Sequence, residues 1–217
     1  MLSAKLKQDL IDEKDMEIIF QQHIIEGDSY FFNSLMNAPE KEYELRKELS
    51  RELNINIRDT VLVGSAKIGF SIKTRQFLEF DEKFKASKMR KDRSDIDIAI
   101  VSQALFDDLS EKLYKFTRHY DKSWIAENWQ VNNYYSTHSP EKPKLHDSFF
   151  YYYAKGWYRP DMLPANFDPP WKDTLGRWRT SLNRKISIGL YRDWKYLKNY
   201  QTDHLETIQS KIKQLEI

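Results

Sequence analysis

Residues 94–101 decide the fold, and they read Ser-Asp-Ile-Asp-Ile-Ala-Ile-Val. Their polar and apolar side chains alternate with the period of two that is typical of a β-strand. Because residues two apart in a strand point to the same face, Asp95 and Asp97 project together while the three isoleucines pack behind them. We therefore expect a strand that buries one face and presents two carboxylates on the other.

The paired carboxylates suit divalent cations. Two aspartates about 6–7 Å apart along a pleat can jointly hold two ions about 3.5–4 Å apart, the geometry used for in-line phosphoryl chemistry. Oxygen ligands favour Mg²⁺, with Mn²⁺ as an alternative, and the chain has no cysteine to favour softer metals. The competing interpretation is an edge strand whose polar face happens to carry aspartate, because Asp-x-Asp is a short motif.

A second short strand precedes the carboxylates. Residues 60–63, Thr-Val-Leu-Val, run into Gly64-Ser65 and then into an expected helix that reaches Phe70. A glycine lets the backbone approach a phosphate closely, a helix N-terminus offers free N–H groups, and Ser65 adds a hydroxyl donor. The spacing to Gly69 is similar to a Walker A loop, but Phe70 stands where the lysine is needed, which excludes that loop. A strand-to-helix turn without a ligand is the competing interpretation.

Helices are expected on both sides of this region. Pro39 opens one helix, and its acidic start and basic end match the helix dipole. Ser102 is a good N-cap for another, from Gln103 to about His119. We therefore predict an α+β fold in which a small mixed β-sheet is flanked by N-terminal and C-terminal helices.

The C-terminal part reads as continuous helix. From Leu175 to Leu197 apolar residues step by three or four, with Gly189 as the one weak point. Basic residues surround Trp178 and Trp194, which can indicate single-stranded nucleic acid, but core packing with basic stems around the rings is the favoured interpretation. We expect a single domain with N-terminal helices in 1–58, a central region with the sheet in 59–170 and C-terminal helices in 171–217. Within the central region, residues 124–170 are rich in aromatic residues and proline and show no clear helix or strand period.

Composition excludes several classes of protein. The chain has 217 residues, 40% hydrophobic and 14% aromatic, which is enough to build one core and argues against disorder. The absence of cysteine excludes disulfide scaffolds, thiolate zinc sites and cysteine nucleophiles. The histidines lack the spacing of a zinc helix and no nucleophile-elbow sequence is present. No apolar run reaches membrane length and no signal-peptide core is seen, so we expect a cytoplasmic protein without a membrane partner.

A basic segment lies between the two strands. Residues 73–93 carry eight basic and four acidic residues, a local excess of four positive charges in a chain whose net charge is +2. Such an excess would attract a polyanion such as RNA, and a solvated loop without a partner is the alternative. The candidate contacts are Lys83, Lys85, Lys88, Arg90 and Lys91.

Together, Val61-Leu-Val-Gly-Ser65 and Ser94-Asp-Ile-Asp-Ile-Ala-Ile100 resemble the signature of the DNA polymerase β-like nucleotidyltransferase superfamily, in particular its minimal bacterial members. The resemblance implies a palm in which Gly64 and Ser65 hold a nucleoside triphosphate and Asp95 and Asp97 hold Mg²⁺. Lys67 falls where such members often carry a basic residue. The insertion 73–93 departs from those small enzymes.

The family's third carboxylate usually lies on a later neighbouring strand. Asp161-Met-Leu-Pro-Ala165 resembles that form, although Pro160 is compatible only with an edge or a strand start. Asp161 is therefore the candidate third metal ligand and catalytic residue. The reserves are Asp147, Asp168 and Asp193.

The resulting prediction is an enzyme that uses Mg²⁺ to transfer a nucleoside monophosphate from a triphosphate to an acceptor. RNA, a protein side chain, a small molecule and a second nucleotide all stay open as acceptors, as does a role in a toxin or phage-defence system. The alternative is a nucleotide-binding or scaffolding subunit that keeps the fold without turnover.

Overall fold

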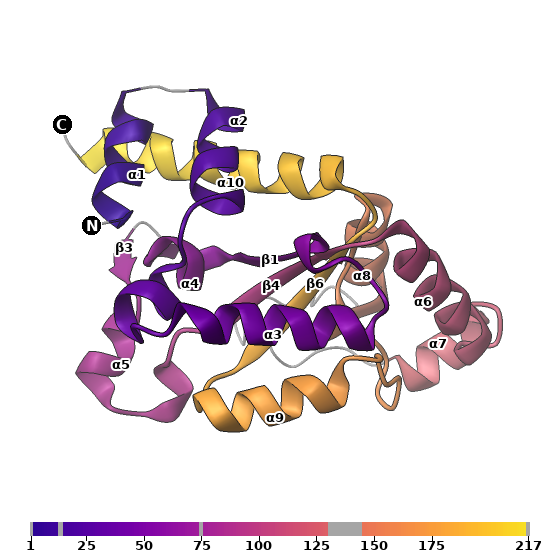
Figure 1. Cartoon of the computed structure of the whole chain (residues 1–217). Helices are drawn as coiled ribbons and strands as arrows, with labels where there is room; N and C mark the ends of the chain where they lie inside the picture. The colour runs from indigo at the N-terminus through magenta and orange to yellow at the C-terminus, as the bar shows by residue number, and fades with distance from the viewer. Residues whose placement is uncertain (1, 13–14, 74–75, 130–144, 216–217) are drawn as a thin grey trace.

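A mixed four-stranded sheet forms the centre of the computed structural model, which describes residues 2–12, 15–73, 76–129 and 145–215 (Figure 1). The strand order is β1-β4-β6-β5. β4 pairs antiparallel with β1 and parallel with β6, and β6 pairs antiparallel with β5. The bounds of these strands are β1 Thr60–Val63, β4 Ile96–Val101, β5 Trp157–Tyr158 and β6 Ile186–Tyr191. The predicted α+β class with a small mixed sheet is confirmed.

Helices cover both faces of the sheet. One face carries α1 (Leu2–Ile11), α2 (Met16–Ile19) and α10 (Trp194–Leu215), and the other carries α3 (Pro39–Glu52) and α9 (Lys172–Leu182) (Figure 1). The remaining α-helices are α4 Gly64–Ile68, α5 Glu82–Ser87, α6 Gln103–Phe116, α7 Lys122–Asn128 and α8 Leu145–Ala154. Short π-helical segments are η1 Phe20–Ile25 and η2 Tyr30–Leu35, and short 3₁₀ segments are η3 Ile57–Asp59, η4 Arg90–Asp92 and η5 Pro160–Met162.

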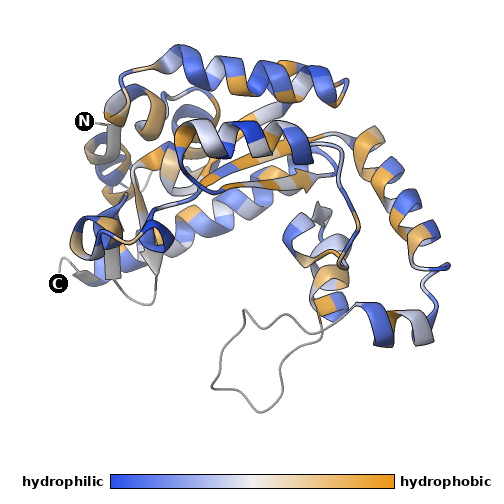
Figure 2. Cartoon of the chain, turned by 90° about the horizontal axis from the view of Figure 1, so that it is seen from below, coloured by the Kyte–Doolittle hydropathy of each residue, from blue (hydrophilic) through white to orange (hydrophobic). Residues whose placement is uncertain are grey.

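The alternation in β4 divides the core in two. Ile96, Ile98 and Ile100 are buried in the cluster that includes residues of α3 and α9, whereas Ala99 and Val101 belong to the cluster that includes residues of α1 and α10. Hydrophobic colour dominates the strands, and the helices show both hydrophobic and hydrophilic stretches (Figure 2). By the same alternation, Asp97 lies on the sheet face that α10 covers.

Several sequence predictions are confirmed at residue level. β1 spans the predicted residues 60–63, α3 begins at Pro39, and α6 begins after Ser102, whose side chain accepts a hydrogen bond from the Leu105 N–H. The predicted helix after Gly64 ends earlier than expected. Gly69 adopts a left-handed conformation with φ of 87°, and Phe70 is the first residue of a strand.

The prediction of continuous C-terminal helix is wrong at β6. Asn183 ends α9 in a left-handed conformation, and Ile186, Ile188 and Leu190 then alternate with small residues as a strand does. Ile186 and Leu190 are four apart and also fit helical spacing, so the pattern alone was ambiguous. Pairing with β4 on one side and β5 on the other stabilises the strand.

The basic segment 73–93 is folded for most of its length. It begins in a hairpin, with β2 (Phe70–Lys73) paired to β3 (Gln76–Glu79), and continues through α5 and η4 to β4. Thr74 and Arg75 lie outside the described residues. Within the part of the chain that the structure describes, no helix is long and apolar enough to span a membrane.

Candidate functional site

Gly64 and Asp97 lie side by side at one end of the sheet. Val63, the last residue of β1, pairs with Asp97 of β4, so the chain turns at Gly64 beside that carboxylate. Gly64 has φ of 66°, and a Cβ at this position would lie 2.9 Å from Asp97 Oδ2. The left-handed backbone conformation favours glycine here, and any larger residue would press against the Asp97 carboxylate. The structure thus brings the predicted Gly-Ser turn and the predicted carboxylate strand together, with Ser65 in the first turn of α4.

Asp95 lies just before β4, and its side chain contacts Lys185, the residue just before β6. Its Oδ2 atom lies 3.1 Å from Nζ of Lys185, and the Ile96 N–H donates to the Lys185 carbonyl. One step further along the parallel pair, Ser187 lies opposite Asp97. Lys185 and Ser187 therefore lie opposite the two carboxylates. A third carboxylate at either position would have given a metal site with three carboxylate ligands.

A buried ion pair fixes the approach to this strand. Asp81 and Ser94 bond reciprocally, since the Asp81 N–H donates to Ser94 Oγ at 2.9 Å and the Ser94 N–H donates to Asp81 Oδ1 at 2.9 Å. Nη1 of Arg184 donates to Asp81 Oδ1 at 2.7 Å and to the Ser94 carbonyl at 3.2 Å, and Nη2 donates to Asp81 Oδ2. These three residues are named the Asp81 clamp. They hold the residue before Asp95 from two directions.

The clamp is shielded from water by aromatic rings. The side chains of Arg184 and Asp81 are 8% and 10% exposed, and the guanidinium lies 4.9 Å from the Phe31 ring centroid and 5.0 Å from that of Phe80. Burial opposes ionisation of Asp81, but the hydrogen bonds from Arg184 and Ser94 outweigh it and hold the pKa of this carboxyl below its usual value. The basic segment is thereby tied to the carboxylate strand.

An aromatic cluster stands on the Asp97 face of the sheet. Trp157 and Tyr191 stack with ring centroids 5.5 Å apart and an interplanar angle of 9°, and Tyr200 of α10 lies 4.5 Å from Trp157. Burial raises the pKa of Tyr191 well above its usual value, with the charges of Tyr200 and Asp97 adding to the rise. Burial therefore keeps both tyrosines neutral on this face of the sheet.

The structure does not bring Asp161 into a carboxylate cluster. Asp161 lies in η5, outside any strand, and accepts two hydrogen bonds from Arg159 at 3.1 and 2.6 Å. The reserves are also engaged: Asp147 with His146, Asp168 with Lys172, and Asp193 with the backbone at the start of α10. Among the described residues, no three His, Asp or Glu side chains are grouped so that they could hold a metal ion.

Lys67 lies away from solvent. It is 4% exposed, and its Nζ donates to the Gly27 carbonyl in the N-terminal region. Burial lowers the pKa of this lysine. Contact with a nucleotide, as the sequence predicted, requires this buried ammonium to become accessible.

Sequence reasoning did not find the Asp81 clamp, because Asp81 and Arg184 are 103 residues apart. Nor did it identify Lys185 as the partner of Asp95. The available signal was the run Asn-Arg-Lys before an alternating Ile-Ser-Ile segment, which a strand prediction at β6 would have placed beside Asp95. Comparisons with protein families, curated protein sequences and solved structures find no match to this chain.

Proposed function

We propose that the chain is a Mg²⁺-dependent nucleotidyltransferase that moves a nucleoside monophosphate from a triphosphate to an acceptor hydroxyl. The observation that carries the proposal is the contact between Gly64 and Asp97, where a Cβ would meet the carboxylate. In this proposal, a glycine turn suited to a phosphate lies next to a carboxylate suited to a metal ion. The resemblance to the polymerase β-like superfamily supports the same assignment.

The roles follow from this arrangement. Gly64 and Ser65 hold the triphosphate, and Asp95 and Asp97 hold Mg²⁺, which when bound neutralises phosphate charge. The acceptor oxygen forms a bond to the α-phosphorus, the bond from that phosphorus to the bridging oxygen of pyrophosphate breaks, and the acceptor proton is released. Asp161, once released from Arg159, is the proposed third ligand.

A second candidate function is a nucleotide-binding subunit without turnover. It is favoured by Lys185 beside Asp95 and by the absence, among the residues described, of a three-carboxylate group. Calorimetric titration with a nonhydrolysable triphosphate, with and without Mg²⁺, tests binding, and pyrophosphate release tests turnover. Binding with turnover supports the enzyme, binding alone supports the subunit, and no binding contradicts both.

The acceptor is proposed to be anionic and to bind to the basic segment 73–93. The reaction is proposed to take place in the cytoplasm, with a toxin or phage-defence system as one setting. The five candidate contacts, Lys83, Lys85, Lys88, Arg90 and Lys91, are all exposed. Lys85 has an exposed ion pair with Glu79 at 3.5 Å, which contributes little to stability. The cations are therefore available to a polyanion.

Changing these five residues to serine should weaken binding of single-stranded RNA while triphosphate binding is retained. Each lost phosphate contact should reduce the slope of log affinity against log salt by about 0.7, which filter binding at several salt concentrations measures. The control changes three exposed lysines of α6 and α7, Lys112, Lys115 and Lys122, and the two slopes are compared per charge removed. An unchanged salt slope in the five-residue variant would identify the segment as solvated surface.

Asp161→Asn should lower turnover by about 10²-fold with triphosphate binding retained, because a ligand on the acceptor side matters most in the transition state. Pyrophosphate release and calorimetry measure the two effects. Asp108→Asn is the control, since Asp108 lies outside the candidate site and also has a neighbouring cation, Lys112, at 2.7 Å. Full activity in Asp161→Asn would remove Asp161 from the proposed site.

A further inference from the structure

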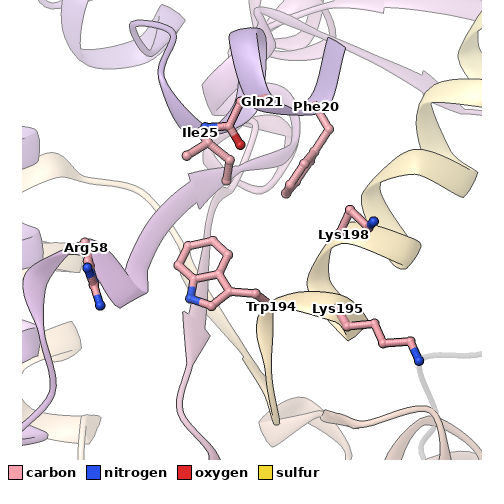
Figure 3. A pocket seen from close by; sticks show the side chains of 7 residues that line it. All are labelled: Phe20, Gln21, Ile25, Arg58, Trp194, Lys195 and Lys198. Atoms are coloured by element: carbon pink, nitrogen blue, oxygen red, sulfur yellow. The ribbon is translucent and has the colours of Figure 1, made fainter. Parts of the chain in front are cut away.

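A cavity of about 570 Å³ opens between η1, η3 and the start of α10 (Figure 3). Its size falls within the range of small-molecule sites. Apolar surface comes from Phe20, Ile25 and Trp194. The full lining is Phe20, Gln21, Ile25, Arg58, Trp194, Lys195 and Lys198.

The cavity is separate from the Gly64 and Asp97 end of the sheet. Arg58 precedes β1, whereas Gly64 follows it, so the two sites lie at opposite ends of this strand. Trp194 follows β6, whose last residue, Tyr191, pairs with Val101 at the far end of β4 from Asp97. The length of the four-residue strand β1, about 13 Å, separates the ends.

Trp194 supplies a flat surface at the mouth of this cavity. Trp194 is 37% exposed, whereas Trp178 is 8% exposed and packs in the core. Core packing was the favoured sequence interpretation for both rings, and it holds for Trp178 but not for Trp194. Phe20 and Ile25 lie to one side of the indole, and Arg58 and the two lysines lie on either side of it (Figure 3). An exposed indole among cations is suited to stacking against a flat, anionic ligand.

The charges of the lining are all positive. Lys198 is engaged by Glu17 at 2.7 Å, and the Nε atom of Arg58 lies 3.9 Å from Asp59 Oδ1. The Arg58 side chain is 82% exposed, so its terminal nitrogens are open to an anion. Lys195 has no ion-pair partner within the described ranges. Arg58 and Lys195 therefore attract an anion to the cavity from two sides.

Gln21 adds a directional group. Its amide nitrogen donates to Glu26 Oε1 at 2.8 Å, which fixes the amide and leaves the carbonyl oxygen turned toward the cavity (Figure 3). That oxygen can accept a hydrogen bond from an N–H group on a ligand ring. The lining thus combines a stacking surface, an acceptor for a ring N–H and cations for an anion.

We propose that this cavity binds a nucleoside phosphate, with the base stacked on Trp194 and the phosphate beside Arg58. An N–H donor of the base bonds to Gln21, and Lys195 adds electrostatic attraction. This site does not rest on the proposed transfer reaction, because it uses none of the residues at Asp95 and Asp97. Its occupant is a free nucleoside monophosphate.

Calorimetry with adenosine monophosphate in the absence of divalent metal tests the site in the full chain. Trp194→Leu and Arg58→Gln should each weaken binding about tenfold, in line with the loss of one stacking or phosphate contact. Trp194→Phe, which keeps a stacking ring, should retain most of the affinity. Lys122→Gln on α7 is the matched charge control and should bind as the wild type does.

Two further comparisons separate the sources of affinity. Adenosine and ribose 5-phosphate should both bind more weakly than the nucleotide, because each lacks one of the two contacts. Asp95→Asn with Asp97→Asn should leave this metal-free binding unchanged, which keeps the test independent of the proposed enzyme. The proposal is overturned by ribose 5-phosphate binding as tightly as the nucleotide, by full affinity in both Trp194→Leu and Arg58→Gln, or by no binding at millimolar concentration.

Discussion

Replacing Arg184 with methionine should lower the free energy of unfolding by about 3–5 kcal/mol, the usual cost of leaving one charge of a buried pair without its partner. Asp81 would then be a buried carboxylate with only Ser94 as a hydrogen-bond partner from the clamp. Urea unfolding measures the loss. Arg177→Met is the control, because Arg177 forms an exposed ion pair with Glu48 at 3.6 Å and should change stability by less than about 1 kcal/mol.

The pair can be tested as a unit. Asp81→Asn keeps a residue that tolerates the left-handed conformation of this position, where φ is 64°. The double variant should be less destabilised than the sum of the two single variants, because neither charge is then left alone. Additive losses would mean that the two side chains do not interact in solution.

Acid should also weaken the clamp. The pKa of Asp81 is lower in the folded chain than its ordinary value, so its contribution to stability is present above that ordinary value of about 4 and is lost as the pH falls through the folded pKa. The stability advantage of the wild type over Asp81→Asn should therefore narrow below about pH 4. An advantage that stays constant down to pH 2 would contradict the assigned shift.

The second large effect is expected at the carboxylates. Asp95→Asn with Asp97→Asn should reduce metal-dependent pyrophosphate release by about 10³-fold or more, because both proposed Mg²⁺ ligands lose their charge. The fold should be retained, since the variant removes the repulsion between two like charges and the ion pair of Asp95 with Lys185 that it loses is exposed. Thermal unfolding measures this second expectation.

Asp203→Asn is the control for this variant, because Asp203 is an exposed carboxylate of α10. An unchanged rate of pyrophosphate release in the double variant would contradict the proposal that the chain is an enzyme. A large fall in melting temperature would instead give the carboxylates a structural role. For the subunit without turnover, the corresponding readout is the loss of Mg²⁺-dependent triphosphate binding.

Local sequence patterns were sufficient for β1, β4, α3 and α6. In each of these elements the hydrophobic residues follow a single period. The helices also have clear boundary residues, Pro39 at the start of α3 and Ser102 before α6. β6 was not predictable in the same way, because Ile186 and Leu190 are four apart and satisfy helix and strand periods at once. Only the hydrogen bonds to β4 and β5 decide between the two.

Only part of the candidate site was likewise predictable from local sequence patterns. Gly64 and Asp97 could be placed together from sequence because a glycine turn and a carboxylate strand have a recognisable order. The Asp81 clamp and the contact of Lys185 with Asp95 could not, because they depend on which strand lies beside β4. The exposure of Trp194 was not predicted, because its place in an apolar stripe does not show that it is the first residue of α10.

The parallel pairing of β4 with β6 affects how the nascent chain can fold. Each pair joins residues ninety positions apart, such as Ile96 and Ile186, and β4 is the inner strand between β1 and β6. At ribosomal speeds, β4 is made about 5–18 s before its parallel partner. During that interval one edge of a strand rich in isoleucine is open to other chains. Translation speed between the two strands, more than the rate of the final docking, then sets how long each new copy is exposed to aggregation.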